Sequence, residues 1–505
     1  MAINPTVTRT HPRLAVQAFW LTFARFLAAL FGILTPVLLV RLLSQHEYGV
    51  YKQVFLFAGT TISAAAFGVG VSAYYYMPRQ PQRGGQIALN ILVYNVLVGL
   101  VPLLLLSFYP SVLNVVFRGG DLQPYAPLLG LFVMLALNGV LVEMIPTAIQ
   151  DVRNSTLFVV GTQLLRALAV VFAALVFRTV HSIIVASTIA VAVSVVILLR
   201  YLHQKFGAFW KHFDVRFFFE QLAYALPLGA YGIIWVIRKD LDNYFVSAIY
   251  PPGQYAIYAI GWLEVPLISL FLESMLSVMV VRISALHQEG RIEDIRNVLA
   301  SAINRLATVQ FPIYAILLVA GRDLIVFVYT KAYAASAPIF YITITLIVLN
   351  VFIYDPVVRA YLELRKFILV VRITVLAAMC IALVPVIHHF GMIGAAVAAV
   401  LGDLAERLIV GWRICRTIGA TRRDARLLSD VPRVAAVAAL VAFGVRSAAA
   451  SQPLFIRLAL TGISFGLVYV GGFYLWRLPG SDVVTKDRLL GFVRSAKERL
   501  RGARG

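Results

Sequence analysis

Charged side chains inside an apolar stretch are the residues of this sequence that could do chemistry. Four of them lie in what otherwise reads as a membrane-spanning helix before the turn Pro251-Pro252-Gly253: Arg238, Lys239, Asp240 and Asp242. A charge at membrane depth costs about 2.5–3.5 kcal/mol on insertion scales, so it persists where it faces a wet cavity or a partner. Arginine and lysine can replace the hydration of a phosphate with charge-assisted hydrogen bonds. The stretch therefore predicts recognition of an anion.

A second cation, Arg25, lies about eleven residues into the first predicted span, near mid-bilayer at ~1.5 Å per residue. That span holds no acid, so Arg25 either faces an anion-binding cleft or pairs with a carboxylate of another helix, such as Glu264. Arg238 and Lys239 point about 100° apart on a helix. Arg238 is also i, i+4 from Asp242 and could be neutralised by it, which would leave Lys239 the freer cation. We predict Arg25, Lys239 and Arg238 as cleft cations.

Acids at membrane depth are candidates for coupling or gating. We assign this role to Asp240, Asp242 and Glu264, and Glu264 could carry a coupling proton or simply neutralise a cleft cation. Glu143 and Asp355 lie near the predicted cytoplasmic ends of spans four and ten. They either form a gate or a static ion pair at a helix end, with partners among the nearby arginines Arg153, Arg359 and Arg365.

Other polar residues in the spans receive weaker assignments. Arg166 lies in span five, which would be peripheral in a six-helix unit, and Asp403 with Arg407 reads as a structural i, i+4 pair. The two cysteines, Cys380 and Cys415, show no metal-ligand spacing, so we predict no metal, cofactor or catalytic residue. Candidate lining groups for a sugar are Tyr94, Asn95, Gln163, Tyr231 and Trp235.

The composition requires many elements that cross a membrane. The chain has 505 residues, of which 61% are hydrophobic and 13% charged, and its mean hydropathy is +0.86. A soluble protein carries about 25% charged residues, and one apolar segment of about 20 residues crosses a bilayer. The net charge of +21 would suggest nucleic acid in a soluble protein. Here we attribute it to cytoplasmic loops, which collect Lys and Arg.

We predict an all-α polytopic membrane protein with about fourteen transmembrane helices and both termini cytoplasmic. Eight Lys and Arg fall on the predicted outer side, four at membrane depth and the other 32 inside, which favours this orientation. Two six-helix lobes precede two extra helices. The predicted parts are a first lobe (1–203), a linker (204–216), a second lobe (217–416), a basic loop (417–433), the extra helices (434–476) and a basic cytoplasmic tail (477–505).

The lobes are predicted from an internal repeat. His46–Tyr51 (HEYGVY) returns as Gly253–Tyr258 (GQYAIY) at an offset of 207, and Ala126-Pro127 returns as Ala337-Pro338 at an offset of 211. Three further matches share an offset of 212: Asn138 with Asn350, Glu143 with Asp355, and Arg153 with Arg365. Because six spans is an even number, both copies enter the membrane in the same orientation, as in transporters built from parallel repeats. A cleft between the lobes would then be exposed to each side in turn.

These repeated segments also resemble a known family. VRLLSQHEYGVYKQVFLFAG, RKDLDNYFVSAIYPPGQYAIYAI and IGAAVAAVLGDLAE are similar to segments of bacterial polysaccharide flippases, which export lipid-linked O-antigen and capsule repeat units. The resemblance covers about residues 14–416. Where the family often has Asp-Arg, this chain has Lys239-Asp240-Leu241-Asp242, so the cation precedes the acid.

The resemblance implies membership in the multidrug/oligosaccharidyl-lipid/polysaccharide exporter superfamily. It implies a flippase of the bacterial cytoplasmic (inner) membrane that acts in polysaccharide or lipopolysaccharide biosynthesis by alternating access. Its cargo would be a polyprenyl-pyrophosphate-linked oligosaccharide, and its partners would be membrane lipids and other polysaccharide-assembly proteins, with the chain acting as a monomer and binding no nucleic acid. A lipid II flippase and a multidrug exporter remain alternatives. A membrane enzyme is disfavoured, because no nucleophile–base pair or Gly-rich phosphate loop is present.

Overall fold

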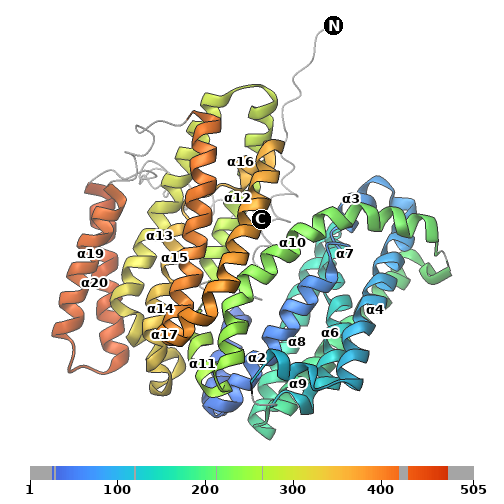
Figure 1. Ribbon diagram of the computed structural model, residues 1–505, viewed down its shortest axis with the longest axis horizontal. Coiled ribbons are helices and arrows are strands. Elements are labelled where there is room, and N and C mark those ends of the chain that lie inside the picture. The colour runs from blue at the N-terminus through green and yellow to red at the C-terminus, as the bar shows by residue number, and fades with distance from the viewer. Residues whose placement is uncertain are drawn as a thin grey trace, which may run out of the picture. The chain divides into compact units, whose positions relative to one another are not determined.

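The fold is helical throughout the part of the chain that the structure describes. The computed structural model describes residues 26–27, 30–118, 121–211, 213–263, 266–419 and 430–475, and these ranges contain helices and turns but no strand (Figure 1). The chain divides into two compact units, Met1–Ala259 and Ile260–Gly505. The predicted basic tail and most of the predicted basic loop lie outside the described residues.

Unit 1 is a bundle of long helices with short connecting pieces. Helix α4 packs on α6, α6 on α9, and α8 on both α7 and α9. The helices of this unit are α2 (Gln45–Ala66), α3 (Ser72–Arg79), α4 (Gly84–Phe108), α5 (Val112–Val116), α6 (Ala126–Gly139), α7 (Leu141–Ala148), α8 (Val152–Phe177), α9 (Val180–Phe206), α10 (Val215–Ile249) and most of α11 (Pro252–Gly261).

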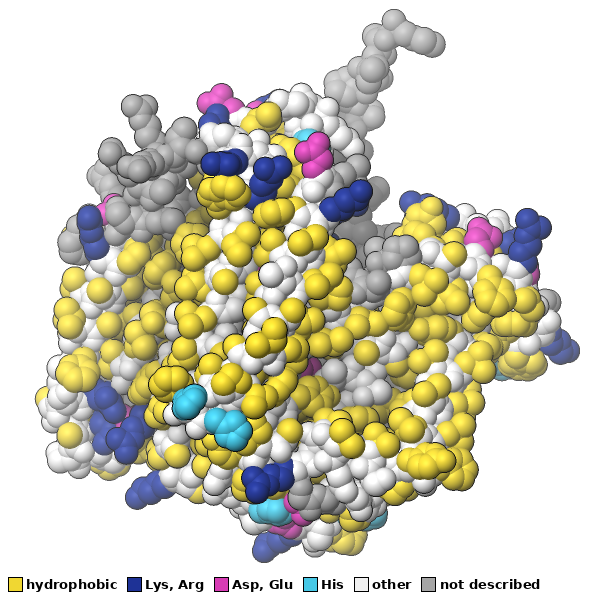
Figure 2. Space-filling view, in the orientation of Figure 1, with side chains coloured by type: hydrophobic (Ala, Val, Ile, Leu, Met, Phe, Trp, Pro, Cys, Tyr) yellow, Lys and Arg dark blue, Asp and Glu magenta, His cyan; other side chains and the backbone are white. Residues whose placement is uncertain are grey.

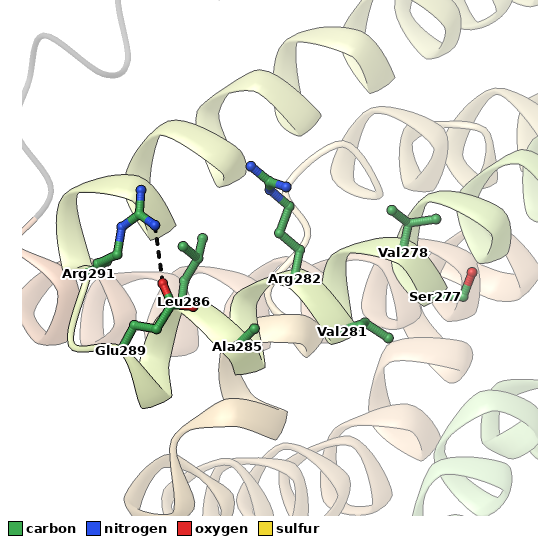
Figure 3. Close-up of a pocket in the computed structure, with 8 residues that line it drawn as sticks. All are labelled: Ser277, Val278, Val281, Arg282, Ala285, Leu286, Glu289 and Arg291. Atoms are coloured by element: carbon green, nitrogen blue, oxygen red, sulfur yellow. Dashed lines mark hydrogen bonds and ion pairs between the residues drawn. The ribbon is translucent and has the colours of Figure 1, made fainter. Parts of the chain in front are cut away.

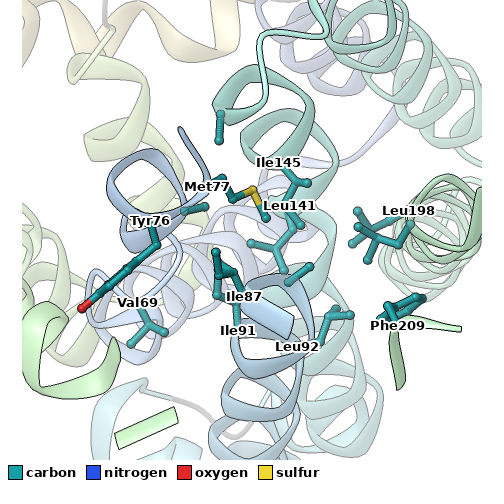
Figure 4. Packing of buried hydrophobic residues seen from close by; sticks show 14 of the residues in the cluster. Val69, Tyr76, Met77, Ile87, Ile91, Leu92, Leu141, Ile145, Leu198 and Phe209 are labelled. Atoms are coloured by element: carbon teal, nitrogen blue, oxygen red, sulfur yellow. The ribbon is translucent and has the colours of Figure 1, made fainter. Parts of the chain in front are cut away.

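Aliphatic and aromatic side chains from four helices fill one of the cores of unit 1. Met77 of α3, Ile87 of α4, Ile145 of α7 and Leu198 of α9 are each at most 1% exposed (Figure 4). Phe209, from the short helix that follows α9, closes the same cluster. Because this core joins helices far apart in the sequence, it holds the unit together as one body.

Unit 2 contains α12 (Pro266–Gln288), α13 (Ile292–Tyr329), α14 (Ala337–Thr343), α15 (Thr345–Leu349), α16 (Asp355–Ala360), α17 (Leu362–Ile418), α19 (Asp430–Ala448) and α20 (Leu454–Leu475). Hydrophobic side chains form a wide belt over the visible face of this unit, and Lys and Arg gather toward its two ends (Figure 2). That distribution suits helices that cross a lipid layer.

Nine helices among the described residues are long and apolar enough to cross a membrane. One of them, α17, runs for 57 residues, or ~86 Å at ~1.5 Å per residue, which is too long for one crossing. Gly391 interrupts it with φ 64° and ψ −153°. This kink falls between the predicted spans eleven (residues 367–388) and twelve (residues 392–413) and divides α17 into two crossings.

Three long helices are absent from these nine: α2, α10 and α12, with 22, 35 and 23 residues. Helices α2 and α10 contain polar and charged residues, which lower their mean hydropathy. The polypeptide is therefore a multi-pass membrane protein, and the total of fourteen spans stays a prediction. The charged segment 282–296, which the hydropathy of the sequence indicates as a loop between spans eight and nine, is mostly helical, because α12 continues to Gln288 and α13 begins at Ile292.

The two spans that contain the repeat-related residues are both broken. Helix α6 ends at Gly139 and α7 begins at Leu141, and α15 ends at Leu349 before α16 begins at Asp355. Backbone carbonyls released at a break need other donors when they lie inside a membrane. The Asn95 amide supplies one in unit 1, donating to the Leu137 carbonyl at 2.8 Å.

A carboxylate attaches the last two helices to unit 2. Asp323 of α13 is 6% exposed and accepts hydrogen bonds from Arg446 of α19 at 2.7 Å and from Arg457 of α20 at 2.8 and 3.0 Å. The fork of Arg457 binds both carboxylate oxygens, which is a strong geometry. These contacts orient the α19–α20 hairpin on α13.

Candidate functional site

The charged stretch of the sequence forms one side of a polar interface in unit 1. We call it the α2–α10 seam and define it by Gln45, Gly49, Gln53 and Thr60 of α2, which share one helical face, and by their partners Asp240, Ser247, Pro252 and Gly253. Gln45 donates to the Gly253 carbonyl at 3.1 Å, Gln53 to the Ser247 hydroxyl at 2.8 Å, and Thr60 to the Asp240 carboxylate at 2.8 Å.

Local sequence explains why α2 begins where it can reach this seam. Ser44 and Glu47 form a capping box: the Ser44 hydroxyl accepts from the Glu47 backbone at 3.2 Å, and the Glu47 carboxylate accepts from the Ser44 backbone at 2.9 Å. The helix ends at Ala66, and the two residues that follow, Phe67 and Gly68, both have positive φ. Glu47, part of the repeated motif, is therefore engaged in helix initiation.

Gly49 allows the two sides of the seam to touch. A Cβ at this position would lie 1.8 Å from the carbonyl oxygen of Pro252, so only glycine fits. At the other end of the helix a Cβ on Gly229 would lie 2.2 Å from the Phe67 carbonyl oxygen. Helix α2 therefore contacts α10 and α11 at backbone distance at two levels.

The two predicted acids of the stretch both have hydroxyl partners. Asp242 is 1% exposed and accepts hydrogen bonds from the Tyr258 hydroxyl at 2.5 Å and from the Asn243 amide at 3.4 Å. Within the described ranges its carboxylate forms no ion pair, so Asp242 is not paired directly with Arg238, which was one of the two alternatives. The tyrosine comes from α11, a helix further along the chain, which the i, i+4 spacing does not reveal.

The predicted cations have different positions. Lys239 is exposed and its ammonium lies 5.7 Å from the centre of the Trp235 ring, whereas Arg238 is half-buried. Arg25 and Glu264 lie outside the described residues, as does the side chain of Tyr231. Their assigned roles stay predictions. Two other predicted lining groups have structural partners: the Asn95 amide serves the break in span four, and the Tyr94 hydroxyl donates to the Ala65 carbonyl at 3.0 Å.

The repeat-related acids Glu143 and Asp355 both lie at the start of the helix that follows a break. Each is in the first turn, of α7 and α16 respectively, where the helix dipole favours a negative charge. Asp355 lies 4.0 Å from Arg372, an arginine that we did not consider as its partner. Arg365 instead donates to the Arg359 carbonyl at 2.6 Å. The gating role of both acids stays a prediction.

Sequence reasoning missed a buried polar cluster beside the second break. Arg372 donates to the Glu406 carboxylate at 2.9 Å, and the Tyr354 hydroxyl donates to the same carboxylate at 2.6 Å. Arg372 is 5% exposed and Glu406 2%. An arginine in an apolar span was the available signal. Its partner could not be read from spacing, because the two residues lie on opposite sides of the kink in α17.

The predicted pair of Asp403 and Arg407 is confirmed, with an N–O distance of 2.6 Å. Arg407 also donates to the Leu349 carbonyl at 2.9 Å and to the Asn350 side chain at 2.7 Å. It therefore supplies the donors that the break after α15 requires, as Asn95 does in unit 1.

A pocket of about 670 Å³ lies at the charged end of α12 (Figure 3). Val278, Val281 and Leu286 give it apolar walls, and Arg282 lies at its rim. Arg291 is already paired with Glu289 at 3.1 Å and with Asp294 at 2.6 Å. None of the predicted site residues lines this pocket, and no group of metal-binding side chains occurs among the residues that the structure describes.

Comparison with known proteins identifies the fold. A family model described as "Polysaccharide biosynthesis protein" matches residues 14–287. No curated protein matches the sequence. Among solved structures, the lipid II flippase MurJ in an inward closed conformation is similar with a TM-score of 0.69 and 15% identity, over 92% of this chain and 99% of that one.

Two other solved structures have the same architecture. An inward-facing multidrug resistance MATE family transporter of the MOP superfamily has a TM-score of 0.63 and 14% identity, over 78% of this chain and 96% of its own. A MOP superfamily transporter from Pyrococcus furiosus, described as having a binding pocket of reverse polarity, has a TM-score of 0.58 and 16% identity over 80% and 95%. At these identities the three likenesses establish the fold, and the cargo must be argued from the residues.

Proposed function

We infer the function from one premise: this chain belongs to the polysaccharide biosynthesis protein family, whose model matches just over half of its residues. It is a multi-pass membrane protein with the fold of MOP-superfamily transporters. We propose that it is a flippase rather than an enzyme. Its cargo would be a polyprenyl-pyrophosphate-linked oligosaccharide, moved across the cytoplasmic membrane for polysaccharide or lipopolysaccharide biosynthesis, such as that of O-antigen or capsule.

The arrangement of charges on α10 carries the proposal of an anionic cargo. Asp240 and Asp242 both accept hydrogen bonds from hydroxyl groups in or beside the α2–α10 seam. Lys239, next to them in sequence, is exposed and lies against Trp235. The helix therefore turns its acids toward a protein interface and presents a cation and an aromatic ring at its surface. A pump for organic cations would need the opposite arrangement.

Alternating access requires that the α2–α10 seam open and close. Two of its three side-chain hydrogen bonds join an amide to a hydroxyl or carbonyl oxygen and contribute about 0.5–1.5 kcal/mol net each, whereas the third is accepted by the Asp240 carboxylate and contributes about 1.5–3 kcal/mol. Roughly 2.5–6 kcal/mol would then separate the closed and open states from this source, a difference that cargo binding can overcome. We propose that opening of the seam releases the cargo on one side of the membrane.

Flipping by the purified protein tests the function. Reconstituted in proteoliposomes, the native chain is expected to move a fluorescent polyprenyl-pyrophosphate oligosaccharide between leaflets. Lys239→Ala and Arg25→Ala should slow this movement at least about tenfold, since each removes a charge-assisted contact of about 1.5–3 kcal/mol. Lys366→Ala, an exposed lysine of α17, serves as the control and should flip at the native rate. Export of a lipophilic cation without lipid movement would overturn the proposal in favour of a drug exporter.

A lipid II flippase is the second candidate, supported by the similarity to MurJ over nearly its whole length. The two candidates differ in the size and constancy of the sugar part of the cargo. Flipping of a labelled long-chain oligosaccharide lipid, measured with and without excess lipid II, separates them. Competition by lipid II together with failure to move the long oligosaccharide would favour the second candidate.

The setting of the protein follows from the same proposal. We propose that it lies in the inner membrane of a bacterium with both termini in the cytoplasm, and that it acts as a monomer among other polysaccharide-assembly proteins. Cytoplasmic termini place the substrate-loading side where lipid-linked sugars are made, and the excess of Lys and Arg in the predicted inner loops supports that orientation.

A further inference from the structure

Arg166 occupies an unusual position in unit 1. It is the fifteenth residue of the 26-residue helix α8, and α8 is one of the nine helices apolar enough to span a membrane. It therefore lies ~21 Å from the start of a helix ~39 Å long, near the middle of the bilayer. The proposed cleft cations do not include it, and the mechanism above makes no use of it.

Aromatic rings from two other helices surround its guanidinium group. The group lies 5.4 Å from the ring centre of Phe55 on α2 and 5.7 Å from that of Phe132 on α6. The rings of Phe55 and Phe132 meet edge to face at 5.6 Å, and the Tyr51 ring lies 4.8 Å from Phe55. Tyr51 is also close enough to interact electrostatically with Arg166.

No carboxylate among the residues that the structure describes balances this charge. The side chain of Arg166 forms neither a hydrogen bond nor an ion pair with any residue in the described ranges, and it is half-buried. A guanidinium has five N–H donors, and the faces of two phenyl rings satisfy none of them as a hydrogen-bond acceptor would. An aliphatic side chain would pack on these rings without the cost of a charge. The donors therefore indicate a polar ligand.

We propose that Arg166, the Tyr51 hydroxyl and the faces of Phe55 and Phe132 form an oxyanion site in unit 1 that binds a phosphate or carboxylate group of the transported glycolipid. Arginine matches both groups because its planar fork donates two parallel hydrogen bonds. Aromatic walls with a few placed polar groups are the usual lining of a small-molecule site. This inference rests on the proposed function and adds a second anion contact to it, on α8 rather than on α10, which carries Lys239.

Binding by variants of the full-length protein tests the site. Two lipids are compared, a polyprenyl-pyrophosphate oligosaccharide with a uronic acid and the same lipid with a neutral sugar in its place. Arg166→Gln is expected to weaken binding about 10- to 100-fold, the loss of one charge-assisted contact, and Arg166→Lys less. Arg178→Gln changes an exposed arginine at the end of the same helix and should bind like the native protein.

The pattern across the two lipids identifies the oxyanion. A loss confined to the acidic glycan assigns the site to the sugar carboxylate, and an equal loss for both lipids assigns it to the pyrophosphate. Native affinity of Arg166→Gln for both lipids would overturn the proposal and leave the residue a packing element. If Arg166→Gln fails to fold, Arg166→Lys and Tyr51→Phe decide the question, since native affinity in both also overturns it.

A readout independent of transport keeps the two proposals apart. Inorganic pyrophosphate should raise the melting temperature of the native protein, and by less in Arg166→Gln. If the native chain flips no lipid-linked saccharide yet keeps this difference, the proposed function fails and the anion site stands. If the native chain flips the lipid and the two proteins respond equally to pyrophosphate, only the site fails.

Discussion

At the scale of single residues, the protein places charges where lipid or protein would exclude water. Arg372 and Glu406 are both nearly inaccessible, and the Tyr354 hydroxyl satisfies the same carboxylate oxygen as Arg372. Burying such a pair costs free energy of desolvation. Removing one partner costs more, because it leaves the other charge buried without a counter-charge. This pair joins the two parts of α17 on either side of Gly391.

Removing one member of this pair gives a test at this scale. Arg372→Met is expected to destabilise the protein by about 3–5 kcal/mol, measured by denaturant unfolding in detergent. The double variant Arg372→Met/Glu406→Gln should recover much of that loss, because no charge is then left alone. Arg291→Met, which breaks an exposed pair, should cost less than about 1 kcal/mol. Equal effects of the two single variants would contradict this account.

Local spacing predicts partners on one helix and fails for partners on two. Asp403 and Arg407 were found from their i, i+4 spacing, and the structure confirms the pair. The same rule also allowed a pair of Arg238 and Asp242, but the hydroxyl partner of Asp242 is Tyr258 on α11. Nothing in the sequence near Arg372 indicates Glu406, since the kink in α17 folds the chain back between them.

At the scale of elements, the α2–α10 seam depends on a close approach that only glycine allows. Gly49→Ala should push α2 away from α11, because the added Cβ would fall 1.8 Å from a backbone oxygen that cannot move aside alone. We expect a shift toward the open seam, seen as faster maleimide labelling of a cysteine placed at Ser247, which is fully buried.

The matched control is Gly59→Ala on the same helix, where a Cβ would meet no atom within 4 Å. Cys380 and Cys415 are exposed and must first be replaced. Labelling at the native rate in Gly59→Ala and at a higher rate in Gly49→Ala is the expected result. Identical rates in the two variants would show that α2 and α11 separate as easily with the extra methyl group as without it.

Some element boundaries could be predicted and others could not. The break between spans eleven and twelve falls at Gly391, as hydropathy indicated. The breaks inside spans four and ten were not predicted, although Asn138 lies beside the first break and Asn350 beside the second. A break inside an apolar run leaves no local signal in the sequence, because side chains of other helices donate hydrogen bonds to the released carbonyls. Asn95 does so at the first break and Arg407 at the second.

At the scale of the whole molecule, the all-helical membrane fold was predictable because apolar runs of about 20 residues recur along the chain, and a helix satisfies the backbone hydrogen bonds of such a run within the run itself. The exporter fold was implied by the resemblance to polysaccharide flippases, and the similarity to MurJ and MATE transporters confirms that fold. The number of spans could not be predicted from the sequence as securely. A count of spans relies on hydropathy, and the polar residues of α2 and α10 lower the mean hydropathy of these two long helices.

Orientation in the membrane is testable with single cysteines in a cysteine-free background. Helix α13 separates the turn after Gln288 from the segment that contains Ala335, and both residues are exposed. Because Lys and Arg gather in the predicted inner loops, an impermeant maleimide should label Ala335→Cys on intact spheroplasts and Gln288→Cys only after permeabilisation. The reverse pattern would invert the predicted topology.

The attachment of the last two helices also has a consequence for the order of events during synthesis. Asp323 is made 123 residues before Arg446 and 134 before Arg457. At about 5–20 residues per second, α13 leaves the ribosome roughly 6–25 s before its first partner exists. During that interval the Asp323 carboxylate lacks the two arginines that pair with it in the finished protein. Synthesis of the α19–α20 hairpin is thus the step that completes the ion pairs of Asp323.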